Sequence, residues 1–162
     1  MLTRNSLLHY VAMHGRQDIC EILLFAGADL EVKDCIGWTP LYTAVDWGCK
    51  DICKLLLDAG ADAHASVPRC NGRTPLMFAA EFGFCDICKM LLSAGIDVKA
   101  KSEEGCSALH YAAESGNIDI CKLLVSSAEA NVFAMNHAYQ IPSEMVNSMD
   151  HRQKEAALYL KV

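Results

Sequence analysis

Apolar and polar residues alternate along the chain with the period of short helices that each bury one face. The clearest example is the run of Ile52, Leu55, Leu56 and Ala59, which follows the i, i+3, i+4, i+7 spacing of a buried helical stripe. Gly60 follows this run directly and is placed to end the helix in the left-handed conformation. The pattern therefore predicts a helix that stops at Gly60 and is followed by an extended loop.

A shorter apolar stripe precedes this helix. Thr39 is suited to cap the free amides of a helix start, and Pro40 fits the first helical position, where no donor is needed. Leu41 and Val45 supply the apolar stripe, and Gly48 breaks it. Two such helices are too small to cover their own apolar faces, so we expect neighbouring pairs to stack against one another.

The glycines indicate that this unit is repeated. Gly15, Gly48, Gly83 and Gly116 are spaced by 33, 35 and 33 residues, and the other six glycines occupy two further positions of the same lattice. The tripeptide Asp-Ile-Cys recurs at four corresponding places. The pattern predicts a single domain of four repeats and a degenerate capping repeat, at approximately 1–33, 34–68, 69–101, 102–135 and 136–162.

These repeated residues resemble the ankyrin repeat family. The segments that begin at Trp38, Arg73 and Cys106 read WTPLY, RTPLM and CSALH, and they are similar to the opening motif of that family. The Gly-Ala-Asp triplets at Gly27 and Gly60 are similar to its helix-ending motif. The resemblance implies an all-α solenoid of stacked antiparallel helix pairs with β-turn fingers, but it is nearly silent on the particular function.

Some positions depart from the family pattern. The first repeat has Ser6-Leu7 in place of Thr-Pro, and we expect it to act as an N-terminal cap. The second repeat carries two extra residues around Val67-Pro68, which predicts a longer finger. Tyr139 stands where a turn glycine is expected, and the last repeat becomes more polar, as a C-terminal cap should.

Composition and charge narrow the class of protein. The 162 residues are 52% apolar, which is enough to bury a core. The net charge of -6 argues against a nucleic-acid partner, and no apolar run is long enough to span a membrane. The start of the chain has no signal peptide pattern. We therefore expect no nucleic-acid binding, no membrane insertion and a chain that is monomeric by itself.

The nine cysteines favour a reducing compartment, because an odd number cannot pair fully within one chain. We therefore expect a cytoplasmic protein, with the nucleus left open. Cys85 and Cys88 have the C-x2-C spacing of a zinc site, but Cys88 also occupies a position where the family usually has a small aliphatic residue. We favour core burial for Cys20, Cys53, Cys88 and Cys121, and exposure at the turn tips for Cys35, Cys70 and Cys106.

Catalytic chemistry finds little support in the sequence. His9 and His110 occupy the histidine position of the opening motif, where a hydrogen bond within the repeat framework is the favoured role. The chain has no Gly-rich phosphate loop, no HExxH and no Ser-His-Asp or Cys-His arrangement at a meaningful spacing. We therefore expect no enzyme, no cofactor and no metal.

The resemblance places partner binding on a concave strip formed by the turn tips and the first helices. Residues at normally variable positions of this strip are the candidates, and both tryptophans are among them. Ile36, Trp38, Trp47 and Phe82, if exposed together, would form an apolar patch too large to be idle. The candidate residues are Met13, His14, Ile36, Trp38, Asp46, Trp47, Asn71, Arg73, Glu81, Phe82 and Glu114.

The third repeat is the only basic one, and Arg69 and Arg73 flank its finger. This favours a partner with an apolar anchor and an acidic flank. We predict that alanine at Trp38, Trp47 and Phe82 abolishes partner capture and leaves melting nearly unchanged.

The sequence therefore favours a non-catalytic protein-protein interaction module that binds a protein or peptide, centred on repeats two and three. Two alternatives stay open: an inhibitor or effector that blocks an enzyme partner, and a recognition domain of a larger multidomain enzyme.

Overall fold

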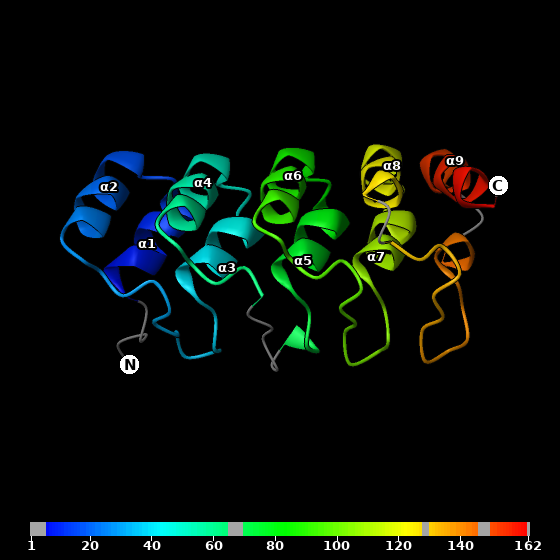
Figure 1. Cartoon of the computed structure of the whole chain (residues 1–162), viewed down its shortest axis with the longest axis horizontal. Helices are drawn as coiled ribbons and strands as arrows, with labels where there is room; N and C mark the ends of the chain where they lie inside the picture. The colour runs from blue at the N-terminus through cyan, green and yellow to red at the C-terminus, as the bar shows by residue number, and fades with distance from the viewer. Residues whose placement is uncertain (1–5, 65–69, 128–129, 146–149, 162) are drawn as a thin grey trace.

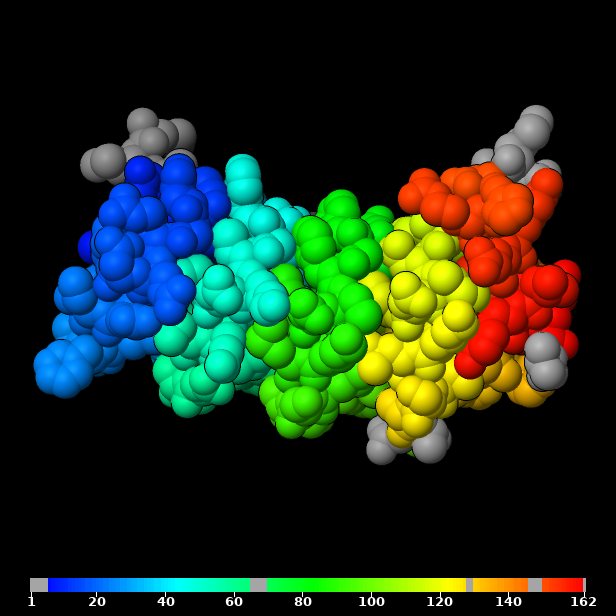
Figure 2. Space-filling view, turned by 90° about the horizontal axis from the view of Figure 1, so that it is seen from above, coloured from blue at the N-terminus to red at the C-terminus, as the bar shows by residue number. Residues whose placement is uncertain are grey.

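The computed structural model describes residues 6–64, 70–127, 130–145 and 150–161, which form a row of stacked helix pairs (Figure 1). In each complete pair an inner helix is followed by an outer helix, and the loops between pairs extend to one side as fingers (Figure 1). Figure 2 shows the repeats as successive slabs along the molecule. The elements are α1 (Leu7–His14), α2 (Gln17–Phe25), α3 (Pro40–Asp46), α4 (Lys50–Asp58), α5 (Pro75–Phe82), α6 (Cys85–Ser93), α7 (Ala108–Glu114), α8 (Ile118–Ser126), the short 3-10 helix η2 (Pro142–Glu144) and α9 (His151–Leu160).

The order of the elements confirms the all-α solenoid. The inner helices α1, α3, α5 and α7 pack on one another in sequence, and the outer helices α2, α4, α6, α8 and α9 form the second row. Each inner helix also packs on the outer helix of its own pair. The buried apolar residues therefore form one core that runs along the stack and is shared between each repeat and the next.

Local signals in the sequence set the helix ends. The hydroxyl of Thr39 accepts a hydrogen bond from the amide of Tyr42 at 3.3 Å, which caps the start of α3. Gly48 lies in the turn between α3 and α4 and has φ 64°. A Cβ atom at this position would lie 2.8 Å from Cζ of Phe84 in the next repeat. Tyr139 has φ 60°, so it adopts the left-handed conformation of the glycine whose place it takes.

A hydrogen bond of one kind joins neighbouring repeats. Nε2 of His110 lies 3.2 Å from the carbonyl oxygen of Gln140, and His9 makes the corresponding contact with the second repeat. Tyr42 occupies the same position in the second repeat, and its hydroxyl donates to the carbonyl of Arg73 at 2.9 Å. The framework role predicted for the two histidines is confirmed, and tyrosine fills it once.

The prediction for the four lattice cysteines is also confirmed. All four side chains are 0% exposed, at the centre of the outer helices. Burial raises the pKa of three of their thiols to about 12, which keeps them protonated and unreactive. These cysteines are Cys20, Cys53, Cys88 and Cys121, of which the last three have the pKa near 12.

The prediction for the tip cysteines is confirmed only for Cys35, which is exposed. Cys70 is half-buried, and the indole nitrogen of Trp38 donates to its sulfur at 3.0 Å. For Cys106 the prediction is wrong, since only 2% of the residue is exposed. It follows the turn glycine, and its side chain points inward, where Nδ2 of Asn136 lies 3.6 Å from the sulfur.

The first repeat leaves an apolar end face, which differs from the polar face expected of a cap. Phe25 is 96% exposed, and Ile22 on the same outer helix is mostly exposed. The equivalent of Ile22 in the third repeat, Met90, is half-buried beside the preceding outer helix. Among the described elements, α2 packs on α1 and α4, and Phe25 and Ile22 are left exposed.

Two expectations fall outside the described residues, namely the longer finger around Val67-Pro68 and the position of Arg69. Within the described ranges, no helix combines the length and the apolar character that a membrane crossing requires.

Candidate functional site

The last turns of the inner helices carry two rows of side chains at equivalent positions. Asp46, Glu81 and Glu114 form a row of carboxylates at the ends of α3, α5 and α7. Trp47 and Phe82 follow the first two of them and form a short aromatic row. We call these five residues together the inner-helix site. Because α3, α5 and α7 pack side by side, the two rows lie on consecutive repeats of one surface.

The aromatic row is exposed, as predicted. Trp47 is 55% exposed and Phe82 is 52% exposed. The ring of Phe82 lies 6.0 Å from that of Phe78 and 5.9 Å from that of Phe84, measured between centroids. Phe82 is therefore packed against two other aromatic rings and leaves the rest of its ring exposed to solvent.

The carboxylates of this row are partly desolvated and repel one another through Glu81. Burial raises the pKa of Asp46, and the neighbouring charge of Glu81 raises it further. The pKa of Glu114 is raised by the same two causes in the same order. Among the ion pairs of the described residues, only Glu81 of this row takes part.

Arg73 lies beside the centre of the inner-helix site, at the base of a finger. Its Nη1 atom is 2.6 Å from a carboxylate oxygen of Glu81. Its guanidinium lies 4.2 Å from the ring centroid of Tyr111 and 5.5 Å from that of Phe78. Arg73 is thus committed to a contact within the protein, and its charge is largely compensated.

The structure corrects the role predicted for Trp38. Its ring lies 5.3 Å from Tyr42 and 6.3 Å from Phe78, and its indole donates to Cys70. Trp38 is therefore half-buried against the core and is not part of an open apolar patch. Alanine at Trp38 would remove these packed contacts, so on this structure we expect the triple variant of Trp38, Trp47 and Phe82 to melt at a lower temperature than the sequence pattern predicts.

The remaining predicted residues lie at the edges of this surface. Ile36 and Asn71 occupy equivalent finger tips and are exposed, and the Asn71 amide donates to Glu104 of the next tip at 3.1 Å. Met13 and His14 lie at the end of α1. The His14 ring stacks on Tyr10 of its own helix. The first repeat therefore adds neither a carboxylate nor an exposed aromatic anchor to the two rows, and it lies at the edge of the site.

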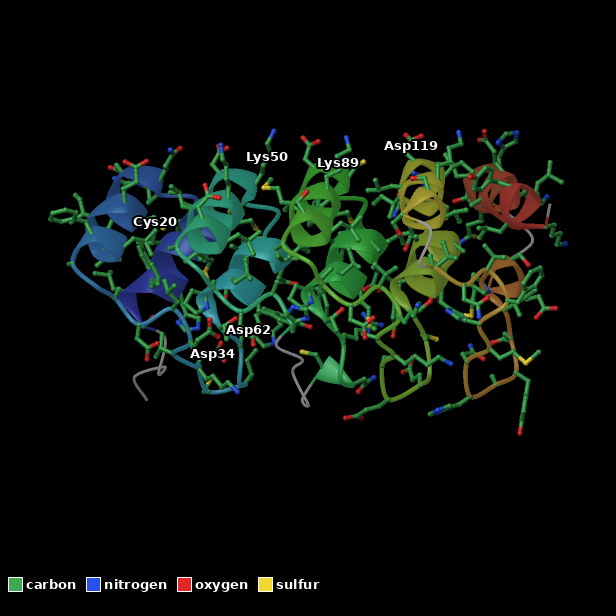
Figure 3. All side chains as sticks on the ribbon, viewed as in Figure 1. Cys20, Asp34, Lys50, Asp62, Lys89 and Asp119 are labelled. Atoms are coloured by element: carbon green, nitrogen blue, oxygen red, sulfur yellow. The ribbon has the colours of Figure 1, made fainter. Side chains whose placement is uncertain are left out.

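The basic charges of the third repeat do not gather into one patch. Lys89 is on the outer helix α6, where it pairs with Asp86, and Figure 3 shows it projecting with Lys50 away from the fingers. Lys101 donates to the carbonyl of Met135 at 2.8 Å. With Arg73 paired as well, the described residues give no support to an acidic flank on the partner.

Sequence reasoning missed the side chains that support the site. Phe78 and Tyr111 are buried and carry the rings on which Arg73 lies. Both residues directly follow the opening motifs RTPLM and CSALH. The recurrence of an aromatic residue at this position could have indicated a shared packing role. The finger residue that packs on those rings is set by contacts between repeats, and the repeat spacing in the sequence does not predict such contacts.

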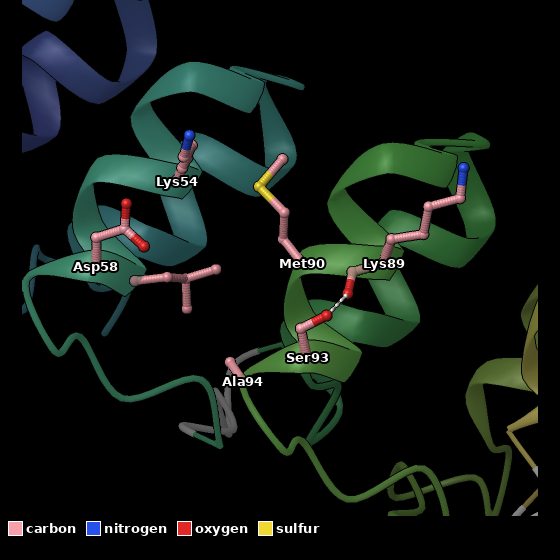
Figure 4. A pocket seen from close by; sticks show the side chains of 7 residues that line it. Lys54, Asp58, Lys89, Met90, Ser93 and Ala94 are labelled. Carbon is pink, nitrogen blue, oxygen red and sulfur yellow. Dashed lines mark hydrogen bonds between the residues drawn. The ribbon is translucent and has the colours of Figure 1, made fainter.

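The outer row carries a groove of its own. A groove of about 380 Å³ lies between α4 and α6 on the outer row and is lined by Leu57, Met90 and Ala94, with Lys54 and Lys89 at its rim (Figure 4). It lacks exposed aromatic rings. In the part of the chain that the structure describes, no three His, Cys, Asp or Glu side chains are grouped to hold a metal ion.

These features define a class of protein: a solenoid of short helix pairs joined by equivalent framework contacts. The family model "Ankyrin repeats (3 copies)" matches residues 2–67 and 59–136, and the chain belongs to the ankyrin repeat family. Proteins of this class offer extended surfaces for binding other proteins.

Two curated relatives match a part of the chain. Protein phosphatase 1 regulatory subunit 12A of Mus musculus is 44% identical over 41 residues, which are 25% of this chain and 4% of that protein. The protein of the same name from Rattus norvegicus matches with the same identity and coverage. The matched segment thus spans a small fraction of these relatives.

Proposed function

We propose that this chain is a non-catalytic interaction module that binds a partner protein or peptide on the inner-helix site, centred on repeats two and three. The observation that supports it most is the exposure of Trp47 and Phe82, which are adjacent in the stack and both more than half exposed. Tryptophan is among the residues most enriched at the energetic centres of protein interfaces, and an exposed phenylalanine ring adds apolar area to bury. The two rings that support Phe82 are already packed against it, so binding there orders few new groups.

The size of the aromatic row sets what it contributes. An aromatic side chain buries roughly 150–250 Å² when covered. Half of that for two rings is about 200 Å², or about 5 kcal/mol at 25 cal/mol per Å². Association itself costs about 4–15 kcal/mol. The two rings therefore anchor a partner but do not hold it alone, and the neighbouring polar residues must contribute.

The proposal is tested by capture of partners and by reconstitution. The purified chain is used as bait in a cell lysate, captured proteins are identified, and each is then expressed and titrated against the bait by calorimetry. We expect the Trp47→Ala/Phe82→Ala variant to lose about tenfold or more in affinity. The matched control is Phe25→Ala/Leu158→Ala, which removes two exposed apolar side chains from the ends of the stack.

Equal affinity of the site variant and the wild type would place binding elsewhere. Circular dichroism must show that both variants are folded at the temperature of the titration, because Trp47 and Phe82 are only about half exposed and their removal also costs some stability.

A second candidate is a regulatory subunit that binds an enzyme and changes its rate. It is favoured by the similarity to a protein phosphatase 1 regulatory subunit. The test is the rate of purified protein phosphatase 1 catalytic subunit on a phosphorylated protein, with and without this chain. No change in rate and no binding would remove this candidate.

A further inference from the structure

The inner-helix site combines apolar rings with negative charge. Asp46 precedes Trp47, Glu81 precedes Phe82, and Glu114 continues the acidic row on α7. The fingers add to this sign, since Glu103 and Glu104 are both exposed in the fourth repeat. The surface that surrounds the exposed rings is therefore acidic.

Arg73 shows which chemistry this surface accepts. Its guanidinium pairs with Glu81 and also lies over the rings of Phe78 and Tyr111. Glu81 belongs to the acidic row, and Phe78 is the ring that supports Phe82. The protein thus contains one cationic side chain bound on an edge of the site by a carboxylate and by aromatic faces.

Two carboxylates of the row are left for a partner. Within the described residues, the ion pairs include neither Asp46 nor Glu114. Asp46 lies beside Trp47, and Glu114 lies one repeat beyond Phe82, so a carboxylate is available on each side of the aromatic row. Burial, and after it the charge of Glu81, raises the pKa of both groups, so a cation that approaches them favours their charged forms.

We infer that the partner segment on the inner-helix site is basic. It presents Lys or Arg side chains whose charged heads meet Asp46 and Glu114, while their aliphatic stems or neighbouring apolar residues cover Trp47 and Phe82. This inference rests on the proposed function, because it names the chemistry of the partner at the same surface.

The test uses two fluorescein-labelled peptides of equal length, one alternating arginine with leucine and the other alternating glutamate with leucine. Binding to the full chain is measured by fluorescence anisotropy at low and at physiological salt. We expect the arginine peptide to bind at least about tenfold more tightly than the glutamate peptide. The net charge of -6 alone would attract a basic peptide, so matched variants are required.

The site variant is Asp46→Asn/Glu114→Gln, and the control is Asp58→Asn/Glu155→Gln. Each removes two carboxylates, but the control residues are exposed on the outer helices α4 and α9. We expect about tenfold weaker binding of the arginine peptide by the site variant and little change by the control. Equal losses in the two variants would show non-specific attraction and overturn the inference.

The Trp47→Ala/Phe82→Ala variant separates this inference from the proposed function. Loss of arginine-peptide binding in the aromatic variant, without loss in the carboxylate variant, overturns the basic partner and leaves the proposed site standing. Unchanged binding in both variants overturns both. Equal binding of the two peptides, or no binding of either by the wild type, also overturns the inference.

Discussion

The contact between Gly48 and Phe84 offers a direct test of how closely the repeats are stacked. Gly48 has φ 64°, and alanine there would place its Cβ 2.8 Å from Cζ of Phe84. Gly95 has φ 80°, but nothing lies within 4 Å of a Cβ atom added to it. The two substitutions therefore share the backbone strain and differ in the clash.

Backbone strain costs about 1–2 kcal/mol when a residue with a Cβ atom is placed in the left-handed conformation. The clash adds about 1–3 kcal/mol, which is the usual cost of overpacking. We therefore expect Gly48→Ala to lower the free energy of unfolding by about 2–5 kcal/mol, and Gly95→Ala by about 1–2 kcal/mol. At this chain length 1 kcal/mol corresponds to about 2–4 °C in Tm.

The assay is urea unfolding followed by circular dichroism for both variants. A double-mutant cycle with Phe84→Leu isolates the contact, because leucine removes the atoms that alanine at Gly48 would meet. The cost of Gly48→Ala should then fall towards that of Gly95→Ala. Equal costs of the two alanine variants in the wild-type background would refute the close approach of the second and third repeats.

Three further predictions follow from burial. Burial lowers the pKa of His110, so the unfolded chain binds more protons than the folded chain between that lowered pKa and about 6.5. The free energy of unfolding should therefore fall by up to about 1.4 kcal/mol per pH unit as the pH drops through this window. Urea unfolding at two pH values in this window should show a smaller loss for His110→Asn than for the wild type. A thiol reagent should modify Cys35 in the folded protein and Cys106 only after unfolding, which mass spectrometry checks and early labelling of Cys106 would contradict. Trp38→Ala should destabilise the fold by about 2–4 kcal/mol, measured by urea unfolding, and an unchanged midpoint would show that its ring packs on nothing.

The repeat architecture could be predicted from the sequence because its causes are local. Thr39 caps α3 through its own side chain, and Gly48 is required by a left-handed turn whose place recurs in the first four repeats. Tyr139 also adopts a left-handed conformation, although tyrosine does not favour it, because the residue stands at a recurring turn position. Local geometry of this kind recurs at a fixed spacing, so the spacing of the residues reveals it.

The candidate site could be predicted in position but not in detail. Trp47 and Phe82 are exposed because their helix positions face outward, and this follows from the period of the repeat. Trp38 and Arg73 stand at one equivalent finger position, yet both fold down onto aromatic rings of the following repeat. Such contacts join residues more than thirty positions apart, so neither their burial nor their charge compensation is written in the local pattern.

The central claim is that a partner binds on the exposed aromatic row of the inner-helix site. The most direct measurement is the Kd of a captured and purified partner for the wild type and for Trp47→Ala/Phe82→Ala, by calorimetry. The account predicts at least about tenfold weaker binding by the variant, with unchanged binding by the end-face control Phe25→Ala/Leu158→Ala. Equal Kd values for the wild type and the Trp47/Phe82 variant would contradict it.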